Sequence, residues 1–257
     1  MNIFVFDIET VPDVETGRRL LGLENLGDEA VAEAMFAQSK EATGQTFLKL
    51  HLQRIIAISA VFRHGKSLKI WSLGEGSSPE PELIQRFFDG IEKFLPTLVS
   101  WNGSGFDLPV LHYRALKHGI AAGSYWENGE HDSTFKYNNY LNRYHTRHLD
   151  LMDVLAGYQQ KGFARLDDIA SMIGLPGKMG MTGSEVYENY IKGELPRIRD
   201  YCEIDVLNTY LVFLRFQLCR AHLSVEQYQH EIELTKETLK QSDQQHLQAF
   251  LETWEKT

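Results

Sequence analysis

The stretch that decides the fold is NIFVFDIET, residues 2–10. Residues 2–8 form a short apolar run that is suited to a buried strand. Asp7 and Glu9 lie two positions apart, so on a strand both side chains point to the same face. Carboxylates this close repel each other, which raises a pKa unless a cation lies between them. The pair therefore predicts a metal site on a core strand, with a strand end emerging into solvent as the alternative.

Further along the chain, strands come first and in pairs, and helices follow. Residues 53–63 and 67–73 predict a hairpin, and residues 97–101 predict another strand. Apolar residues at helical spacing predict helices within residues 80–95, 165–174, 184–217 and 224–256. This order favours an α/β fold in which a mixed sheet carries helices on its faces. We expect one domain over residues 1–217 and a helical C-terminal extension over 218–257 that packs on the same domain.

A second acidic segment, WNGSGFD, occupies residues 101–107. Its two glycines allow the backbone to approach a ligand closely, and Asn102 offers an amide to a phosphate or a base. Asp107 opens a predicted helix that carries Pro109 in its first turn, where proline is tolerated. Asp107 is thus either a site residue or an ordinary helix cap, and this segment alone leaves both readings open.

A third segment, YCEID, places Tyr201 and Asp205 four residues apart on one face of a predicted helix. Such a pair is common and usually exposed. Beside a metal site, however, Asp205 can complete a carboxylate cage and the Tyr201 hydroxyl can hold the attacking water. Oxygen ligands without Cys or His favour Mg²⁺ or Mn²⁺ over zinc. Two such ions about 3.5–4 Å apart stabilise the attacking and leaving oxygens of an in-line displacement.

Taken in this order, the three segments resemble the motifs of DEDDy-type 3′–5′ exonucleases. These enzymes belong to the RNase H-like (DnaQ-like) superfamily, and within it the chain resembles the branch of the proofreading exonuclease domain of family-B DNA polymerases. The motif D-x-E matches Asp7 and Glu9, N-x₃-(F/Y)-D matches Asn102 through Asp107, and Y-x₃-D matches Tyr201 and Asp205. The resemblance covers about residues 1–217 and implies an RNase H-like mixed sheet flanked by helices.

The resemblance also implies the activity: a stand-alone 3′–5′ exonuclease that releases 5′-monophosphates from single-stranded 3′ ends. DNA is the favoured substrate, although the sequence itself does not separate DNA from RNA. Two divalent cations, Mg²⁺ or Mn²⁺, are implied as cofactors, with Asp7, Glu9, Asp107 and Asp205 as their ligands. Tyr201 is expected to position the nucleophilic water, and the terminal nucleotide is expected to contact Thr10, Asn102 and Phe106.

The charge distribution bears on the partner. A net charge of −9 argues against broad electrostatic binding of nucleic acid, but less so against an enzyme whose cations meet the phosphate. Within the long loop of residues 122–147 and just beyond it, residues 136–149 interleave bases and aromatics, which suits a single-stranded end. A solvated loop is the alternative. Lys161, Arg165 and Lys178 add positive charge, but the sequence does not show that they converge.

Competing interpretations concern both the function and the final motif. A nucleic-acid-binding member of the same fold without activity, a metal-dependent hydrolase of small nucleotides and a purely structural protein are alternatives. A related subclass has histidine five residues before its last aspartate, a spacing that His145 and Asp150 reproduce. Since residues 148–153 read as a strand entering a helix, we expect Asp150 and Asp153 to support structure or the edge of the cleft instead.

The remaining features concern the compartment. Cys202 and Cys219 match no metal-knuckle spacing, and a reducing compartment fits them better than a disulfide. The N-terminus does not read as a signal peptide. No stretch of about 18 apolar residues predicts a membrane span. We therefore expect a cytoplasmic protein without membrane contact.

Overall fold

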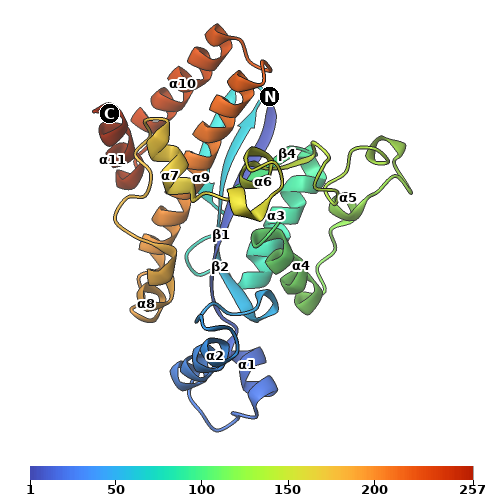
Figure 1. Cartoon of the computed structure of the whole chain (residues 1–257), viewed down its shortest axis with the longest axis vertical. Coiled ribbons are helices and arrows are strands. Elements are labelled where there is room, and N and C mark those ends of the chain that lie inside the picture. Colours follow the sequence, from blue (N-terminus) through green and yellow to red (C-terminus); the bar gives the residue numbers. More distant parts are fainter. Residues whose placement is uncertain (257) are drawn as a thin grey trace.

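The computed structural model describes residues 1–256, and its centre is a mixed five-stranded sheet with strand order β3-β2-β1-β4-β5. The middle strand, β1 (Asn2–Pro12), is antiparallel to β2 (Gln53–His64) and parallel to β4 (Thr97–Ser100). β3 (Ser67–Ser72) pairs with β2, and β5 (His148–Asp150) pairs with β4. Helices flank the sheet (Figure 1), so the predicted α/β class and RNase H-like arrangement are confirmed.

The two faces of β1 meet different helices, because alternate residues of a strand point in opposite directions. Ile3 and Val5 share a core with α9 (Leu195–Cys219). Phe4 and Phe6 pack instead in the core formed with α3 (Glu80–Phe94) and α4 (Asp107–His118). Asp7 and Glu9 continue the odd-numbered series. The register of this one strand therefore decides that both acids face α9.

The α9 face also carries the C-terminal helices, α10 (Val225–Lys240) and α11 (Gln245–Trp254). Arg63 of β2 is buried and its Nε lies 2.7 Å from Oε2 of Glu231 on α10. On α11, Nε2 of His246 lies 2.9 Å from Oε2 of Glu203 on α9. These helices thus share the core of the sheet, while the boundary at residue 217 stays a prediction.

A lobe between β1 and β2 consists of α1 (Val14–Leu21), α2 (Asp28–Thr43) and η1 (Leu50–Leu52), and α1 and α2 lie at the bottom of Figure 1. Its small core contains Val31, Met35 and Leu48. Buried Arg114 of α4 joins this lobe to the rest of the fold, because it forms ion pairs both with Asp13, at the start of α1, and with Glu80 of α3.

Short elements complete the chain. The loop of residues 122–147 contains only α5 (Gly123–Trp126) and η2 (Ser133–Phe135). The others are α6 (Leu151–Leu155), η3 (Gln160–Gly162), α7 (Leu166–Met172), η4 (Gly183–Glu185) and α8 (Val186–Ile191). Among residues 1–256, no helix combines the length and the apolar character that crossing a membrane requires.

Candidate active site

Five predicted side chains meet in one cavity of about 610 Å³ between β1, α4 and α9; they are Asp7, Glu9, Asp107, Tyr201 and Asp205. β1 and α9 pack directly, so the odd face of the strand meets the first half of the helix. The contact is close, since the Cys202 thiol Sγ lies 3.5 Å from Oδ2 of Asp7. The structure therefore brings together three segments that are distant in the sequence.

Asp107 reaches this cavity from the start of α4, a helix that packs on the opposite face of the sheet from α9. Because β1 and β4 are parallel, the chain that leaves β4 emerges at the edge toward which β1 runs. The N–H of Ile8 donates to Oδ1 of Asp107 over 3.1 Å. The N-cap of α4 is Phe106, whose side chain makes no cap hydrogen bond. The interpretation of Asp107 as an ordinary helix cap is therefore wrong.

Asp150 shapes the loop before Asp107 without lining the cavity. Its carboxylate accepts the N–H groups of Asn102 and Ser104, each over 2.9 Å. The loop is tight as well, because a Cβ on Gly103 would lie 2.3 Å from Oγ of Ser100. Nδ1 of His145 accepts the N–H of Asn139 and takes no part in the carboxylate cavity. The expected supporting role of Asp150 is thus confirmed.

The carboxylates perturb one another. Burial, followed by the negative charges of Asp107, Glu9 and Asp205, raises the pKa of Asp7 well above its ordinary value. Burial and the charges of Asp205 and Asp107 do the same to the pKa of Glu9. Burial raises the pKa of Asp107 to about 7. Without a cation, this cluster resists full ionisation at neutral pH.

The residues present fit a divalent cation. Oδ1 of Asp205 is buried and has no hydrogen-bond partner within the described chain. Ligand atoms of Asp7, Glu9 and Cys202 all lie within 4.8 Å of one another. The Cys202 sulfur is a softer ligand that suits zinc or copper better than Mg²⁺ or Mn²⁺. Carboxylate oxygens remain, and these are the ligands that Mg²⁺ and Mn²⁺ prefer.

Lys178 is a site residue whose position the sequence did not reveal. Its Nζ lies 2.6 Å from the Tyr201 hydroxyl and 4.0 Å from Oδ2 of Asp205. Gly177 has φ +67°, and a Cβ there would lie 2.4 Å from Oδ1 of Asp167. That same Oδ1 accepts the N–H of Lys178 over 2.8 Å. The tight turn therefore aims the lysine at the carboxylates.

Of the other two cationic residues named from the sequence, one lines the carboxylate cavity and one does not. Arg165 lines the carboxylate cavity, whereas Lys161 does not. For Lys178, the only sequence signal was a glycine followed by a lysine after a short predicted helix, and this pattern is too common to identify a site residue.

The three residues expected to contact the substrate do not share a single cavity. Asn102 and Phe106 line the carboxylate cavity, whereas Thr10 lines a neighbouring cavity of about 590 Å³. Phe106 and Glu9 border both cavities. The Thr10 hydroxyl donates to Oε1 of Gln53 over 2.9 Å. The roles of these three residues stay predictions.

A protein-family model described as a predicted 3′–5′ exonuclease related to the exonuclease domain of PolB matches residues 45–254. The matched part includes Asp107, Tyr201 and Asp205, and it begins after β1, which carries Asp7 and Glu9. No curated protein matches the chain.

Proposed function

The chain belongs to the family of predicted 3′–5′ exonucleases related to the exonuclease domain of PolB, and on this premise we propose that it shortens single-stranded nucleic acid from the 3′ end. The reaction is hydrolysis of the terminal phosphodiester bond, which releases a 5′-monophosphate. DNA is the preferred substrate. The observation that supports this most is the convergence of four carboxylates and Tyr201 in one cavity.

Asp7, Glu9, Asp107 and Asp205 hold the divalent cations in this proposal. Two Mg²⁺ or Mn²⁺ ions held there would neutralise charge and would activate a water for in-line attack. Oδ1 of Asp205, which has no hydrogen-bond partner within residues 1–256, and the raised pKa values of Asp7 and Glu9 support this assignment, because Lys178 alone does not neutralise four carboxylates. A non-catalytic binder of nucleic acid has no need of such a cluster.

Tyr201 orients the attacking water. Burial and the charges of Asp205, Glu9 and Asp7 hold the pKa of its hydroxyl far above the ordinary value. The group therefore keeps its proton and acts through a hydrogen bond, since a permanently protonated phenol cannot serve as a general base. Lys178 donates to the phenol oxygen, so the hydroxyl has one proton to share between the Asp205 carboxylate, with which it is hydrogen-bonded, and the water.

Lys178 has a second role at the scissile phosphate. It is the cation placed beside Tyr201 and Asp205, where negative charge develops in the transition state. Thr10, Asn102 and Phe106 surround the terminal nucleotide: Phe106 lies where the two neighbouring cavities meet, and its ring is 5.6 Å from that of Phe47.

The proposal is tested with a 5′-labelled single-stranded oligonucleotide, offered as DNA and as RNA, in Mg²⁺, Mn²⁺ or chelator. We expect a ladder that shortens from the 3′ end, mononucleotide 5′-phosphates as products and no cleavage in chelator. A hydrolase of small nucleotides would instead act on free nucleotides and leave the oligonucleotide intact. Binding without cleavage in either metal would contradict the catalytic assignment.

A further inference from the structure

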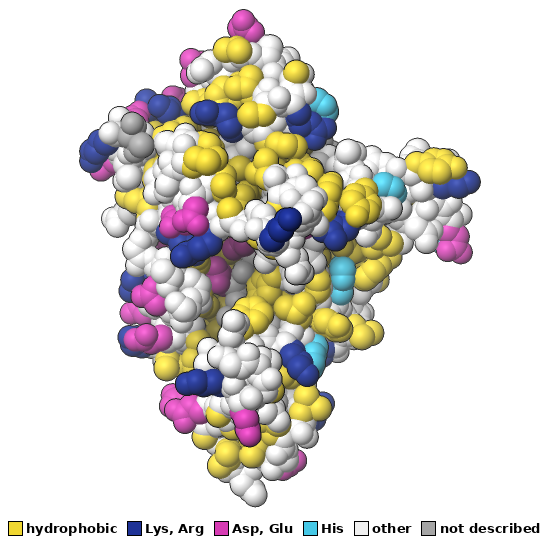
Figure 2. Space-filling model, in the orientation of Figure 1, with side chains coloured by type: hydrophobic (Ala, Val, Ile, Leu, Met, Phe, Trp, Pro, Cys, Tyr) yellow, Lys and Arg dark blue, Asp and Glu magenta, His cyan; other side chains and the backbone are white. Residues whose placement is uncertain are grey.

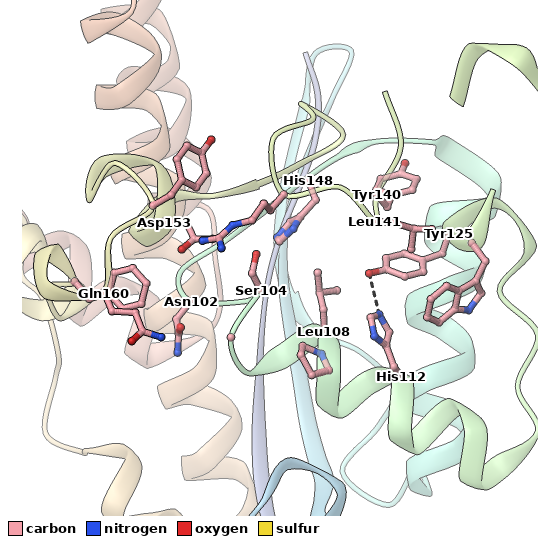
Figure 3. A pocket seen from close by; sticks show the side chains of 16 residues that line it. Asn102, Ser104, Leu108, His112, Tyr125, Tyr140, Leu141, His148, Asp153 and Gln160 are labelled. Carbon is pink, nitrogen blue, oxygen red and sulfur yellow. Dashed lines mark hydrogen bonds and ion pairs between the residues drawn. The ribbon is translucent and has the colours of Figure 1, made fainter. Parts of the chain in front are cut away.

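A third cavity, of about 800 Å³, lies beside the candidate active site and is lined largely by aromatic and apolar side chains. We refer to it as the aromatic cavity. Its walls come from the start of α4, the loop of residues 122–147 and the segment after α6. Figure 3 shows Asn102 and Gln160 on one side, Tyr125 and Tyr140 on the other, and Leu108 between them. Its volume lies within the range of pockets that bury small organic ligands.

Several rings of this cavity are available to a ligand. Trp126 is 48% exposed and Phe163 is 37% exposed, although both are large apolar side chains. Tyr158 is half-buried and also lines the cavity. Exposed aromatic rings that gather in a concave site, unlike single exposed rings, mark a binding surface. Figure 2 shows hydrophobic side chains gathered around the centre of this face of the molecule.

The two histidines of the aromatic cavity are already hydrogen-bonded within the protein. Nε2 of His112 lies 2.9 Å from the Tyr125 hydroxyl, and Nε2 of His148 lies 2.8 Å from Oγ of Ser100. Burial lowers the pKa of each histidine to about 4, so both are neutral at neutral pH. The interior therefore favours a flat, uncharged group over a charged one.

One cation stands among the described lining residues. Arg143 is half-exposed and forms a 2.8 Å ion pair with Asp153, and its guanidinium lies 5.3 Å from the centre of the Tyr158 ring. Rings for stacking beside a positive charge form the combination that binds single-stranded nucleic acid without sequence preference. The other class of ligand, a small anionic metabolite, would meet only this one paired arginine.

The aromatic cavity borders the carboxylate cavity. Asn102, Gly105 and Phe163 line both, so a nucleic-acid chain that leaves the carboxylates needs to cross only these residues to reach the aromatic cavity. The neighbouring cavity at Thr10 shares Glu9, Phe47, Phe106 and Gly183 with the carboxylate cavity, whereas none of its described lining residues lines the aromatic cavity. One cavity can therefore receive the terminal nucleotide while the other receives the strand behind it.

We propose that the aromatic cavity binds bases on the 5′ side of the last two nucleotides, so that a single-stranded tail of several nucleotides is a better substrate than a dinucleotide. The inference rests on the proposed exonuclease function and specifies its substrate. Stacking on Trp126, Tyr158 and Phe163 supplies affinity that the acidic chain cannot obtain from many phosphate contacts.

The test compares wild-type protein, Trp126→Ala and Tyr113→Ala on a dinucleotide and on a single strand of about ten nucleotides. Tyr113 is a matched control, because it is also 48% exposed but does not line the aromatic cavity. We expect Trp126→Ala to lower kcat/KM on the long strand roughly 5- to 100-fold, the usual worth of one stacked base, and to leave the dinucleotide unchanged. Tyr113→Ala should match the wild type on both.

A second measurement uses only the wild type, with an abasic residue placed at successive positions from the 3′ end. An internal position at which base removal weakens both cleavage and binding in Ca²⁺ supports the proposal. Equal losses on dinucleotide and long strand, or no loss at any internal position, overturn it. Failure of the exonuclease proposal itself is recognised separately, because the wild type would then cleave neither substrate.

Discussion

The ammonium group of Lys178 lies 2.6 Å from the hydroxyl oxygen of Tyr201, inside a cavity whose other ionisable groups are mostly carboxylates. Lys178 also lies 4.0 Å from Oδ2 of Asp205. The tight turn at Gly177 therefore places a positive charge where negative charge accumulates in the proposed reaction. The contact joins a residue outside the three acidic motifs to the residue that we assign to water positioning.

Replacing Lys178 with methionine should slow the chemical step. We expect Lys178→Met to lower the single-turnover rate by about 100-fold, as for the loss of one group that stabilises transition-state charge. Substrate affinity should change less, because the lysine contacts the reacting end alone. Lys161→Met is the matched control, since Lys161 is exposed and lies outside the cavity. Equal rates for both variants would contradict the role of Lys178.

Substitution of Asp205 and of Asp150 distinguishes the proposed metal-binding role from the structural supporting role. Asp205→Asn should reduce cleavage almost to background, because it removes a charged ligand whose Oδ1 has no hydrogen-bond partner among residues 1–256. Asp150→Asn should retain much of the activity while lowering stability by about 1–3 kcal/mol, because its carboxylate accepts N–H groups of the loop at Asn102. Rates and urea melts of the two variants check this. Similar losses of activity in both would refute the distinction.

Stability in chelator should depend on pH through Asp107. Its folded-state pKa of about 7 exceeds the ordinary value of 3.8, so the native state holds this proton more tightly than the unfolded state. Stability is therefore lost as pH rises between these two values, and none is lost below about pH 4. Asp107→Asn should raise the free energy of unfolding by roughly 2–4 kcal/mol at about pH 8 and by little at about pH 4.

Asp243→Asn is the control for this measurement, because Asp243 is exposed and distant from the cavity lining. Its free energy of unfolding should stay within about 0.5 kcal/mol of the wild type at both pH values. A gain for Asp107→Asn that is the same in acid and in alkali would show that the ionisation of Asp107 is not its cause.

The sequence could predict those parts of the site that depend only on the regular repeat of a single strand or helix. Alternation along β1 places Asp7 and Glu9 on one face, and the helical repeat places Tyr201 and Asp205 together. Asp107 was ambiguous, because its partner, the N–H of Ile8, is separated by 99 positions. In the sequence, an aspartate at the start of a helix looks the same whether it caps that helix or accepts a hydrogen bond from a distant strand.

Lys178 and the aromatic cavity depend on tertiary structure. Lys178 is aimed by the positive φ of Gly177 and by the carboxylate of Asp167, neither of which has a periodic signature. Residues 136–149 did show mixed bases and aromatics, and Arg143 does line the aromatic cavity. Trp126 and Phe163, however, lie outside that segment and join it only in the fold.

The claim that four carboxylates share divalent cations is tested most directly by Mn²⁺ binding, followed through the electron paramagnetic resonance signal of free Mn²⁺. The comparison is between wild type, Asp205→Asn and Asp200→Asn; Asp200 lies on the same helix but outside the cavity. We predict that the wild type and Asp200→Asn deplete free Mn²⁺ equally, while Asp205→Asn binds fewer ions or binds them more weakly. Unchanged Mn²⁺ binding by Asp205→Asn would contradict the account.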